Sequence, residues 1–362
     1  MSDPAIQALV ERIEQARAAR QPLYIQGGDT KRFYGEAPVG EPLDTRGLSG
    51  ISAYEPSELV VSVRAGTPLA ELEAALAEQG QHLAFEPPRF AANGTVGGMV
   101  AAGLSGPSRA SAGAVRDHLL GASLLNGRGE LLHFGGQVMK NVAGYDVSRL
   151  LAGSLGVLGV ICEVSLKVLP VPPATATLRF EMDEATAIHQ LNTWTGQPLP
   201  LNASAWWDGL LVLRLAGARA AVQAACTQLG GEPIADDLAA PFWTGLRDQR
   251  DEFFVTARRA VQAGAGLWRL SVPSTAQPLG LSGEQLIEWG GAQRWLCTST
   301  PAGNVREAAL QAGGHATLFV AHDHTSRVFA PMQPVLARIH RELKQAFDPD
   351  GIFNRGRLTP EW

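Results

Sequence analysis

The sequence predicts an α+β protein of two domains, and three features of the 362-residue chain lead to that class. A glycine-rich block over residues 92–170 organises the first half. A proline cluster, Pro170-Val171-Pro172-Pro173, marks the best domain boundary in the chain. Beyond it the amino-acid composition changes, because all eight tryptophans follow residue 190. We therefore expect a first domain over 1–172, a smaller α+β domain over 173–330, and a tail over 331–362 that returns to the first domain.

Composition excludes several classes of protein. The net charge is -5 and 18% of residues are charged, with no basic stripe of the kind that binds nucleic acid. The three cysteines, Cys162, Cys226 and Cys297, are odd in number and far apart, so they fit neither a disulfide framework nor a four-cysteine metal site. No apolar run reaches about 18 residues. We expect a cytoplasmic chain, which could still associate peripherally with the inner membrane through a complex.

The N-terminal segment predicts a helix followed by a strand. Asp3 can cap the helix, Pro4 can take its first position, and the helix should end before Pro22. Residues 23–26 then form a short strand that runs into Gly27-Gly28-Asp29-Thr30. The two glycines free the backbone there, and the Thr30 hydroxyl can donate to a phosphate. The turn is a candidate anion cradle, although a Gly-Gly pair taken alone is more typical of a plain surface turn.

Residues 59–63 predict a second strand, and a helix follows it. Thr67 should cap this helix, Pro68 should begin it and Gly80 should close it. Further on, residues 119–125 and 130–134 flank Asn126-Gly127-Arg128-Gly129, which is a hairpin signal. The last strand of the domain is expected over residues 160–169.

Two further glycine turns, at residues 93–98 and 153–159, lie within the glycine-rich block. Such turns allow φ > 0 and let successive N–H groups face one anion, so a cofactor with a diphosphate is the natural occupant. No G-x-G-x-x-G follows a strand and the chain has no Gly-Lys pair, which excludes the Rossmann and P-loop cradles. Residues 99–113 are almost all small. They should either lie against a flat ring such as isoalloxazine or form a flexible surface loop.

Taken in order, these motifs resemble the vanillyl-alcohol-oxidase, or PCMH-type, FAD-binding domain over about 150 residues. Within that family the chain is similar to the smaller FAD-binding subunits of bacterial glycolate oxidases, on its length, its tail and Gly313-Gly314-His315-Ala316-Thr317-Leu318. The matching segments are Gly27-Gly28-Asp29-Thr30, Ala65-Gly66, Thr95-Val96-Gly97-Gly98, Gly113-x-x-Arg116-Asp117, Asn126-Gly127-x-Gly129, Lys140-x-x-x-Gly144-Tyr145-Asp146 and Gly153-Ser154-Leu155-Gly156-x-Leu158-Gly159.

The resemblance implies a set of FAD-binding residues. Two pyrophosphate loops are formed by Gly27, Gly28, Asp29, Thr30, Thr95, Val96, Gly97 and Gly98; Gly113, Arg116 and Asp117 lie beside the flavin; Val160 and Ile161 contact the adenine. The tail reaches the flavin ring, where Asn354 would bond the pyrimidine edge and Arg357 would stabilise negative charge on reduced flavin; an ordinary solvated C-terminus is the alternative. Covalently flavinylated members often carry a histidine where this chain has Gln26 and Asp29, so FAD should bind non-covalently.

The second half predicts its own sheet and helices. Strands are expected over 210–215, 267–272, 294–297 and 316–321, and helices over 218–229 and 305–311. Trp206-Trp207 could mark a docking surface, but core packing is the favoured interpretation.

Histidines supply the few candidates for catalysis or metal binding. His322 and His324 would share one face of a strand with His315 as a third ligand, yet partly exposed histidines at a strand end explain them better, so no metal site is expected. The longer metal-binding motif of the family's larger catalytic subunits has no match here. No residue is a convincing base; His315 and Tyr145 are the weak candidates.

The resemblance implies a function within a complex. The chain would be the FAD-binding subunit of an enzyme that oxidises glycolate, a small 2-hydroxy acid, to glyoxylate. A larger FAD-binding subunit and an iron–sulfur subunit would be its partners. Two alternatives stay open: a self-sufficient FAD-dependent 2-hydroxy-acid oxidoreductase, and a non-catalytic flavin-bearing assembly subunit.

Overall fold

The structure is a computed structural model that describes residues 3–136, 146–322 and 326–361. Its contacts divide the chain into two compact units. The first comprises Met1–Leu104, Ala114–Pro170 and Pro331–Trp362, and the second comprises Ser105–Gly113 and Val171–Ala330. Ser105–Gly113, which the sequence placed in the first domain, therefore groups with the second unit. The predicted domain boundaries themselves stay a prediction.

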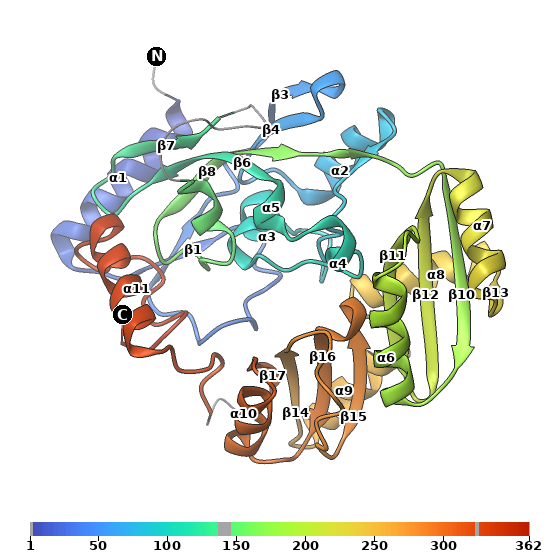
Figure 1. Cartoon of the computed structure of the whole chain (residues 1–362). Helices are drawn as coiled ribbons and strands as arrows, with labels where there is room; N and C mark the ends of the chain where they lie inside the picture. Colours follow the sequence, from blue (N-terminus) through green and yellow to red (C-terminus); the bar gives the residue numbers. More distant parts are fainter. Residues whose placement is uncertain (1–2, 137–145, 323–325, 362) are drawn as a thin grey trace. The chain divides into compact units, whose positions relative to one another are not determined.

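An antiparallel sheet forms the centre of the first unit (Figure 1). Within the described ranges its strand order is β3 (Ile51–Glu55), β4 (Val60–Arg64), β8 (Val160–Lys167), β6 (Leu119–Leu125) and β7 (Leu131–Gly135). Apolar side chains of β4, β6 and β8 pack with those of α2 (Leu69–Glu78) and α3 (Val96–Ala102) in one core. β5 (Gln81–His82) pairs with β9 (Leu169–Pro170), and the short helices are η1 (Pro56–Glu58), α5 (Val115–His118) and η2 (Ser148–Leu151).

The N-terminal helix and the tail share a second core with a parallel strand pair. α1 (Pro4–Ala19) begins as predicted, because the Asp3 carboxylate accepts the Ala5 N–H at 2.8 Å. β1 (Leu23–Gln26) runs parallel to β2 (Glu41–Asp44). Phe353, which follows α11 (Pro334–Phe347), is fully buried and bridges to Leu23. The tail is thus part of the first unit rather than a solvated end.

Two local predictions in the first unit were wrong. The Thr67 hydroxyl accepts the Gly50 N–H at 2.9 Å instead of capping α2, which begins after Pro68. Residues 99–102 belong to α3, where Met99 is only 1% exposed, so this part of the stretch is not a flexible loop. Ala101 and Ala102 line a pocket of the first unit. Gly97 in the first turn of α3 lets the helix lie close to Ala65, which directly follows β4. Composition alone does not show this close approach.

The second unit is an antiparallel sheet with helices. In the described residues its strand order is β13 (Glu232–Ile234), β10 (Ala174–Glu181), β12 (Leu210–Gly217), β11 (Leu201–Trp207), β15 (Glu284–Glu288), β16 (Gln293–Thr298), β14 (Gly266–Ser271) and β17 (His315–Ala321). The helices are α4 (Arg109–Ala112), α6 (Glu184–Thr195), α7 (Arg219–Leu229), α8 (Asp236–Arg247), α9 (Glu252–Gln262), η3 (Trp289–Gly291) and α10 (Ala302–Gln311). The four predicted strands and two predicted helices are confirmed.

Aromatic side chains fill the core of the second unit. Trp206 is 9% exposed and its indole N–H donates to the Met182 carbonyl at 2.9 Å, so the core interpretation holds for it. Trp207 packs edge-on against Phe253 at 6.2 Å between ring centroids. Across the described ranges, every helix falls short of the length and hydrophobicity that a bilayer crossing needs.

Candidate functional site

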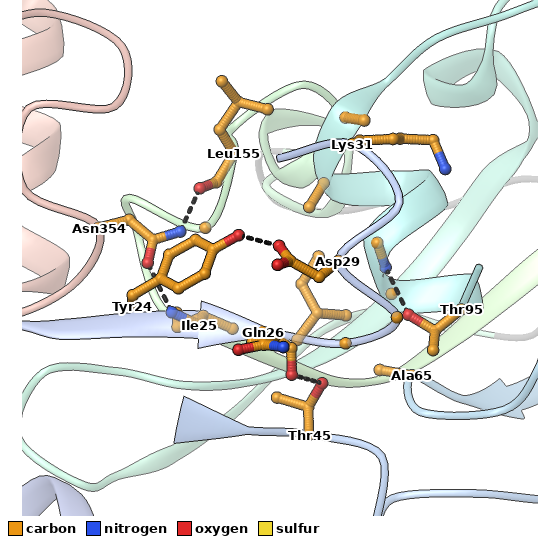
Figure 2. Close-up of a pocket in the computed structure, with 18 of the residues that line it drawn as sticks. Tyr24, Ile25, Gln26, Asp29, Lys31, Thr45, Ala65, Thr95, Leu155 and Asn354 are labelled. Carbon is orange, nitrogen blue, oxygen red and sulfur yellow. Dashed lines mark hydrogen bonds between the residues drawn. The ribbon is translucent and has the colours of Figure 1, made fainter. Parts of the chain in front are cut away.

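A pocket in the first unit gathers residues that are far apart in the sequence (Figure 2). It contains about 740 Å³ of space that is partly open to solvent. Its walls come from β1 and the loop after it, from α3, from the turn at residues 153–159, and from the tail. The lining residues are Tyr24, Ile25, Gln26, Gly27, Gly28, Asp29, Thr30, Lys31, Arg32, Thr45, Ala65, Thr95, Gly97, Gly98, Ala101, Ala102, Leu155, Gly156, Gly159, Ile161, Asn354 and Arg357.

The first glycine turn is locked against the second one. The Asn93 amide donates to the Gly28 carbonyl at 2.6 Å, and a Cβ on Gly28 would lie far inside van der Waals contact with the Asn93 carbonyl. A Cβ on Gly27 would meet the Thr95 hydroxyl in the same way. These glycines are therefore required because two backbones touch, and not only because a ligand approaches.

The loop after β1 presents unpaired donors. No main-chain N–H from Gly28 to Lys31 donates a hydrogen bond to another described residue. Asp29 has φ of +54°, so the loop changes handedness there and forms the kind of concavity in which neighbouring N–H groups can face one anion. The Thr30 hydroxyl lies at this place too. The loop fits an anionic group such as a diphosphate.

Lys31 adds a cation to this loop. Burial lowers the pKa of Lys31 to about 8. Its Nζ lies 3.4 Å from the Thr30 hydroxyl and 5.7 Å from the centroid of the Phe90 ring, and no carboxylate of the described residues forms an ion pair with it. A partly buried ammonium without a counterion would be stabilised by an anionic ligand. Sequence analysis missed Lys31, although it directly follows the glycine turn.

Asp29 lines the pocket and also braces the loop. The Tyr24 hydroxyl donates to one Asp29 oxygen, and Arg32 lies 3.3 Å from the other (Figure 2). Burial and then this hydrogen bond raise the pKa of Tyr24 to about 12. The carboxylate is thereby compensated inside the protein, which matters because a bare negative charge would repel a bound anion. Tyr24 was not predicted from sequence.

The second turn differs from its prediction. Gly97 and Gly98 lie in the first turn of α3, and neither has a positive φ. The Thr95 hydroxyl caps this helix by accepting the Gly98 N–H at 3.2 Å, and the Gly97 N–H donates to the Ala65 carbonyl at 2.7 Å. A glycine is needed at 97 because a Cβ would lie 2.7 Å from the Ala65 Cβ. Val96 is fully buried in the core and does not line the pocket.

Asn354 joins the tail to two other walls of the pocket. Its side-chain oxygen accepts the Ile25 N–H at 2.7 Å, and its amide nitrogen donates to the Leu155 carbonyl at 2.5 Å. The glycine at 156 is required here, because a Cβ would lie 2.6 Å from the Asn354 nitrogen. The amide keeps a second N–H donor, so the expected hydrogen bond to the flavin pyrimidine edge stays a prediction.

Arg357 holds the far side of the loop. Its terminal nitrogens donate to the carbonyls of Tyr34, at 2.6 Å, Arg32, at 3.3 Å, and Glu36. Its Nε is buried and has no hydrogen-bond partner among the described residues. The contacts of the terminal nitrogens fix the backbone of residues 32–36 beside the pocket.

Several predicted site residues lie elsewhere. Val160 is fully buried, while Ile161 beside it lines the pocket. Arg116 and Asp117 are exposed, and the Asp117 carboxylate accepts the Ala114 N–H at 2.8 Å. Gly113 belongs to the second unit. None of Gly113, Arg116 and Asp117 is a lining residue of this pocket, and their place beside the flavin stays a prediction.

The weak catalytic candidates are not brought together. His315 is exposed at the start of β17 in the second unit, and His322 follows the end of that strand, so the predicted strand face for metal binding does not form. Tyr145 and His324 lie outside the described residues, as does most of the glycine turn at 140–146. Among the described residues, no three histidine, cysteine or acidic side chains could hold a metal ion together.

Comparison with known proteins agrees with this geometry. Residues 5–135 match the model of an FAD binding domain. The chain is 46% identical to the glycolate oxidase subunit GlcE of Escherichia coli over 355 residues, which cover 98% of this chain and 97% of that protein. It is 28% identical to the glycolate oxidase subunit GlcD of Bacillus subtilis over 161 residues, 44% of this chain and 34% of that protein.

A solved structure supports the fold alone. An alkyldihydroxyacetonephosphate synthase superposes with a TM-score of 0.62 at 16% identity, covering 96% of this chain and 75% of that one. The unpaired loop donors, the unpaired ammonium and the interlocked glycine turns fit FAD and its diphosphate. Fold and pocket thus define an FAD-dependent oxidoreductase with a PCMH-type FAD-binding domain. The chain belongs to the family of the glycolate oxidase subunit GlcE.

Proposed function

We propose that this chain is the FAD-binding subunit of a glycolate oxidase complex that oxidises glycolate to glyoxylate. The observation that carries the proposal is the similarity to the E. coli subunit, because it extends over both units of the chain. The similarity to the GlcD subunit is confined to less than half of the chain. A second flavin subunit related to the first unit is therefore a natural partner.

The pocket residues would divide the cofactor between them. The N–H groups of residues 28–31, the Thr30 hydroxyl and the Lys31 ammonium would hold the diphosphate. Arg357 would hold the loop after β1 in place beside the cofactor. FAD supplies a two-electron acceptor when bound. Attachment is non-covalent in this proposal, because Gln26 and Asp29 offer no histidine for a covalent link.

Electrons would leave through a partner subunit. Cys162 and Cys297 are buried in different units, and with Cys226 the chain has three cysteines in all, too few for a four-cysteine cluster. An iron–sulfur subunit is therefore the proposed electron acceptor. The complex would be cytoplasmic, with peripheral attachment to the inner membrane through its other subunits.

Anaerobic mixing of the FAD-loaded chain with glycolate or D-lactate tests the need for partners. The visible absorbance of the flavin should stay unchanged over many minutes, because His315, the base candidate that the structure describes, does not line the pocket. Rapid bleaching by either acid would contradict the proposal. It would place the substrate site on this chain, with His315, His322 and His324 the first residues to replace.

Glycolate turnover by the complete complex distinguishes an electron-carrying role of this chain from a purely structural one. A Gly28→Ala chain, which should assemble without its flavin, would be combined with the partner subunits. Loss of glycolate turnover supports our proposal. Full turnover would instead indicate a non-catalytic assembly subunit.

A further inference from the structure

Two buried charges lie at the C-terminal end of α11, just before the last residues of the tail. Lys344 is 4% exposed and Asp348 is 1% exposed, and the distance from Lys344 Nζ to Asp348 Oδ2 is 2.7 Å. They are four residues apart, so both side chains lie on the same face of the helix end. Neither residue lines the pocket, and the proposed chemistry does not use them. We call this pair the tail clamp.

The lysine reaches two other segments as well as Asp348. Its Nζ donates to the Val157 carbonyl at 2.7 Å and to the Phe353 carbonyl at 2.9 Å. All three N–H groups of the ammonium thus have an acceptor. Val157 belongs to the glycine turn that contributes Leu155 and Gly156 to the pocket wall, and Phe353 directly precedes Asn354.

The aspartate fixes the start of the tail. Its oxygens accept the Ile352 N–H at 3.1 Å and the Phe353 N–H at 2.8 Å. Room for it comes from the hairpin glycine at 127, since a Cβ there would lie 2.8 Å from the Asp348 Cα. The same stretch of tail then joins β1, because the Asn354 N–H donates to the Leu23 carbonyl at 2.9 Å.

A buried ion pair is a poor way to stabilise a fold. Apolar side chains of similar volume often stabilise a protein as well or better, since they carry no desolvation cost. What apolar side chains cannot do is donate to two carbonyls and accept two N–H groups at fixed positions. The clamp makes four such main-chain hydrogen bonds, all to the turn at 153–159 or to the tail. Its arrangement therefore serves position more than stability.

We propose that Lys344 and Asp348 are positioning residues for the cofactor: they hold the glycine turn and the tail together so that Asn354 and Arg357 complete the pocket wall. The inference rests on the proposed FAD site. It assigns a role in cofactor binding to two residues that are outside the pocket. The clamp acts before FAD arrives, because every contact in it is made within the protein.

Three variants separate positioning from stability. Lys344→Met leaves the Asp348 carboxylate buried without its cation. Lys344→Met combined with Asp348→Asn removes both charges and keeps an acceptor for a tail N–H. Arg294→Met is the matched control, because Arg294 is a fully buried cation in the second unit that pairs with Glu184 at 3.6 Å and donates to the Gln277 carbonyl at 2.9 Å. Each apoprotein is titrated with FAD, and its thermal midpoint and amide hydrogen exchange are measured.

The clamp variants should lose FAD affinity whether or not they lose stability. We expect both to bind FAD at least about tenfold more weakly, as for the loss of two or more hydrogen bonds. Exchange at Ile352, Phe353 and Asn354 should quicken in both apoproteins. The double variant should recover part of the thermal midpoint lost by the single one, since it buries no unpaired charge. The Arg294 control should lower the midpoint and leave FAD affinity unchanged.

Other outcomes would overturn the inference. FAD affinity that returns with stability in the double variant, or that falls equally in the Arg294 control, would make the clamp a stability element only. If neither clamp variant folds, exchange in the wild-type apoprotein decides: the tail amides must be protected as well as those of β8. A wild-type chain that binds no FAD would contradict the proposed function instead, and the exchange data would still test the clamp.

Discussion

Single hydrogen bonds in the loop after β1 decide how well it can receive an anion. The loop contains an acidic side chain, Asp29, within a site proposed for a diphosphate, and two negative charges repel each other. The Asp29 carboxylate is compensated by two partners within the protein, Tyr24 and Arg32. Glycine-rich loops reveal a cradle in the sequence because φ and close approach depend on local residue type. The brace from Tyr24 depends on a strand and a loop folding together, so residue type alone does not predict it.

Removing the Tyr24 hydroxyl should weaken cofactor binding. Tyr24→Phe deletes the hydrogen bond to Asp29 and leaves the ring in place, so we expect FAD affinity to fall about three- to tenfold, the usual effect of one hydrogen bond. Titration of the apoprotein with FAD measures it. Tyr54→Phe is the control, since it loses a comparable bond to Gln81, at 2.8 Å, away from the pocket. Equal affinity in the two variants would show that the brace does not shape the site.

Lys31 should make FAD binding depend on pH. The pKa of Lys31 in the free chain is about 8, lowered by burial, and a bound anion would raise it again. The protonated form binds the anion, so FAD affinity should be constant below pH 8 and decrease as the pH rises above it. Lys31→Met should bind FAD more weakly at pH 7 and should show a flat profile between pH 7 and 9.5. A wild-type profile without any decrease in that window would exclude Lys31 from the cofactor site.

At the scale of elements, the two glycine turns behave as one interlocked unit. Residues of both turns line the pocket, but the conformation predicted for the second turn was wrong, because Gly97 and Gly98 begin a helix. Composition cannot distinguish a glycine with positive φ from one that admits a neighbouring backbone. The position of Ala65, directly after β4, shows that Gly97 is of the second kind.

Replacing Gly28 should abolish FAD binding. A Cβ in Gly28→Ala would overlap the Asn93 carbonyl, so the two turns would have to separate and the loop would lose its shape. Gly94→Ala in the adjoining turn is the control, because its Cβ would meet nothing nearer than the Thr30 hydroxyl at 3.5 Å and its φ is not positive. FAD content of the purified proteins reports the effect. Wild-type content in the Gly28 variant would move the diphosphate off this loop.

For the whole molecule, sequence and structure agree most where apolar residues recur with a regular period. The α+β class, the first helix and the four apolar strands of the second unit could be read from periodicity. β15 could not, because Glu288 within it is buried and accepts hydrogen bonds from Trp295, at 2.7 Å, and Gln293, at 3.0 Å. A buried carboxylate in a strand looks like an exposed one until its partners are known.

The FAD content of the purified chain, expressed without partner subunits, tests the central claim most directly. The first unit contains every described lining residue of the pocket, so the chain alone should bind one FAD. The measurement is the flavin absorbance before and after denaturation, together with the mass of the denatured protein. We expect about one flavin per chain, released completely on denaturation, and a protein mass without FAD added. A mass increased by that of FAD would contradict non-covalent binding, and a chain that takes up no FAD after reconstitution would contradict the cofactor site itself.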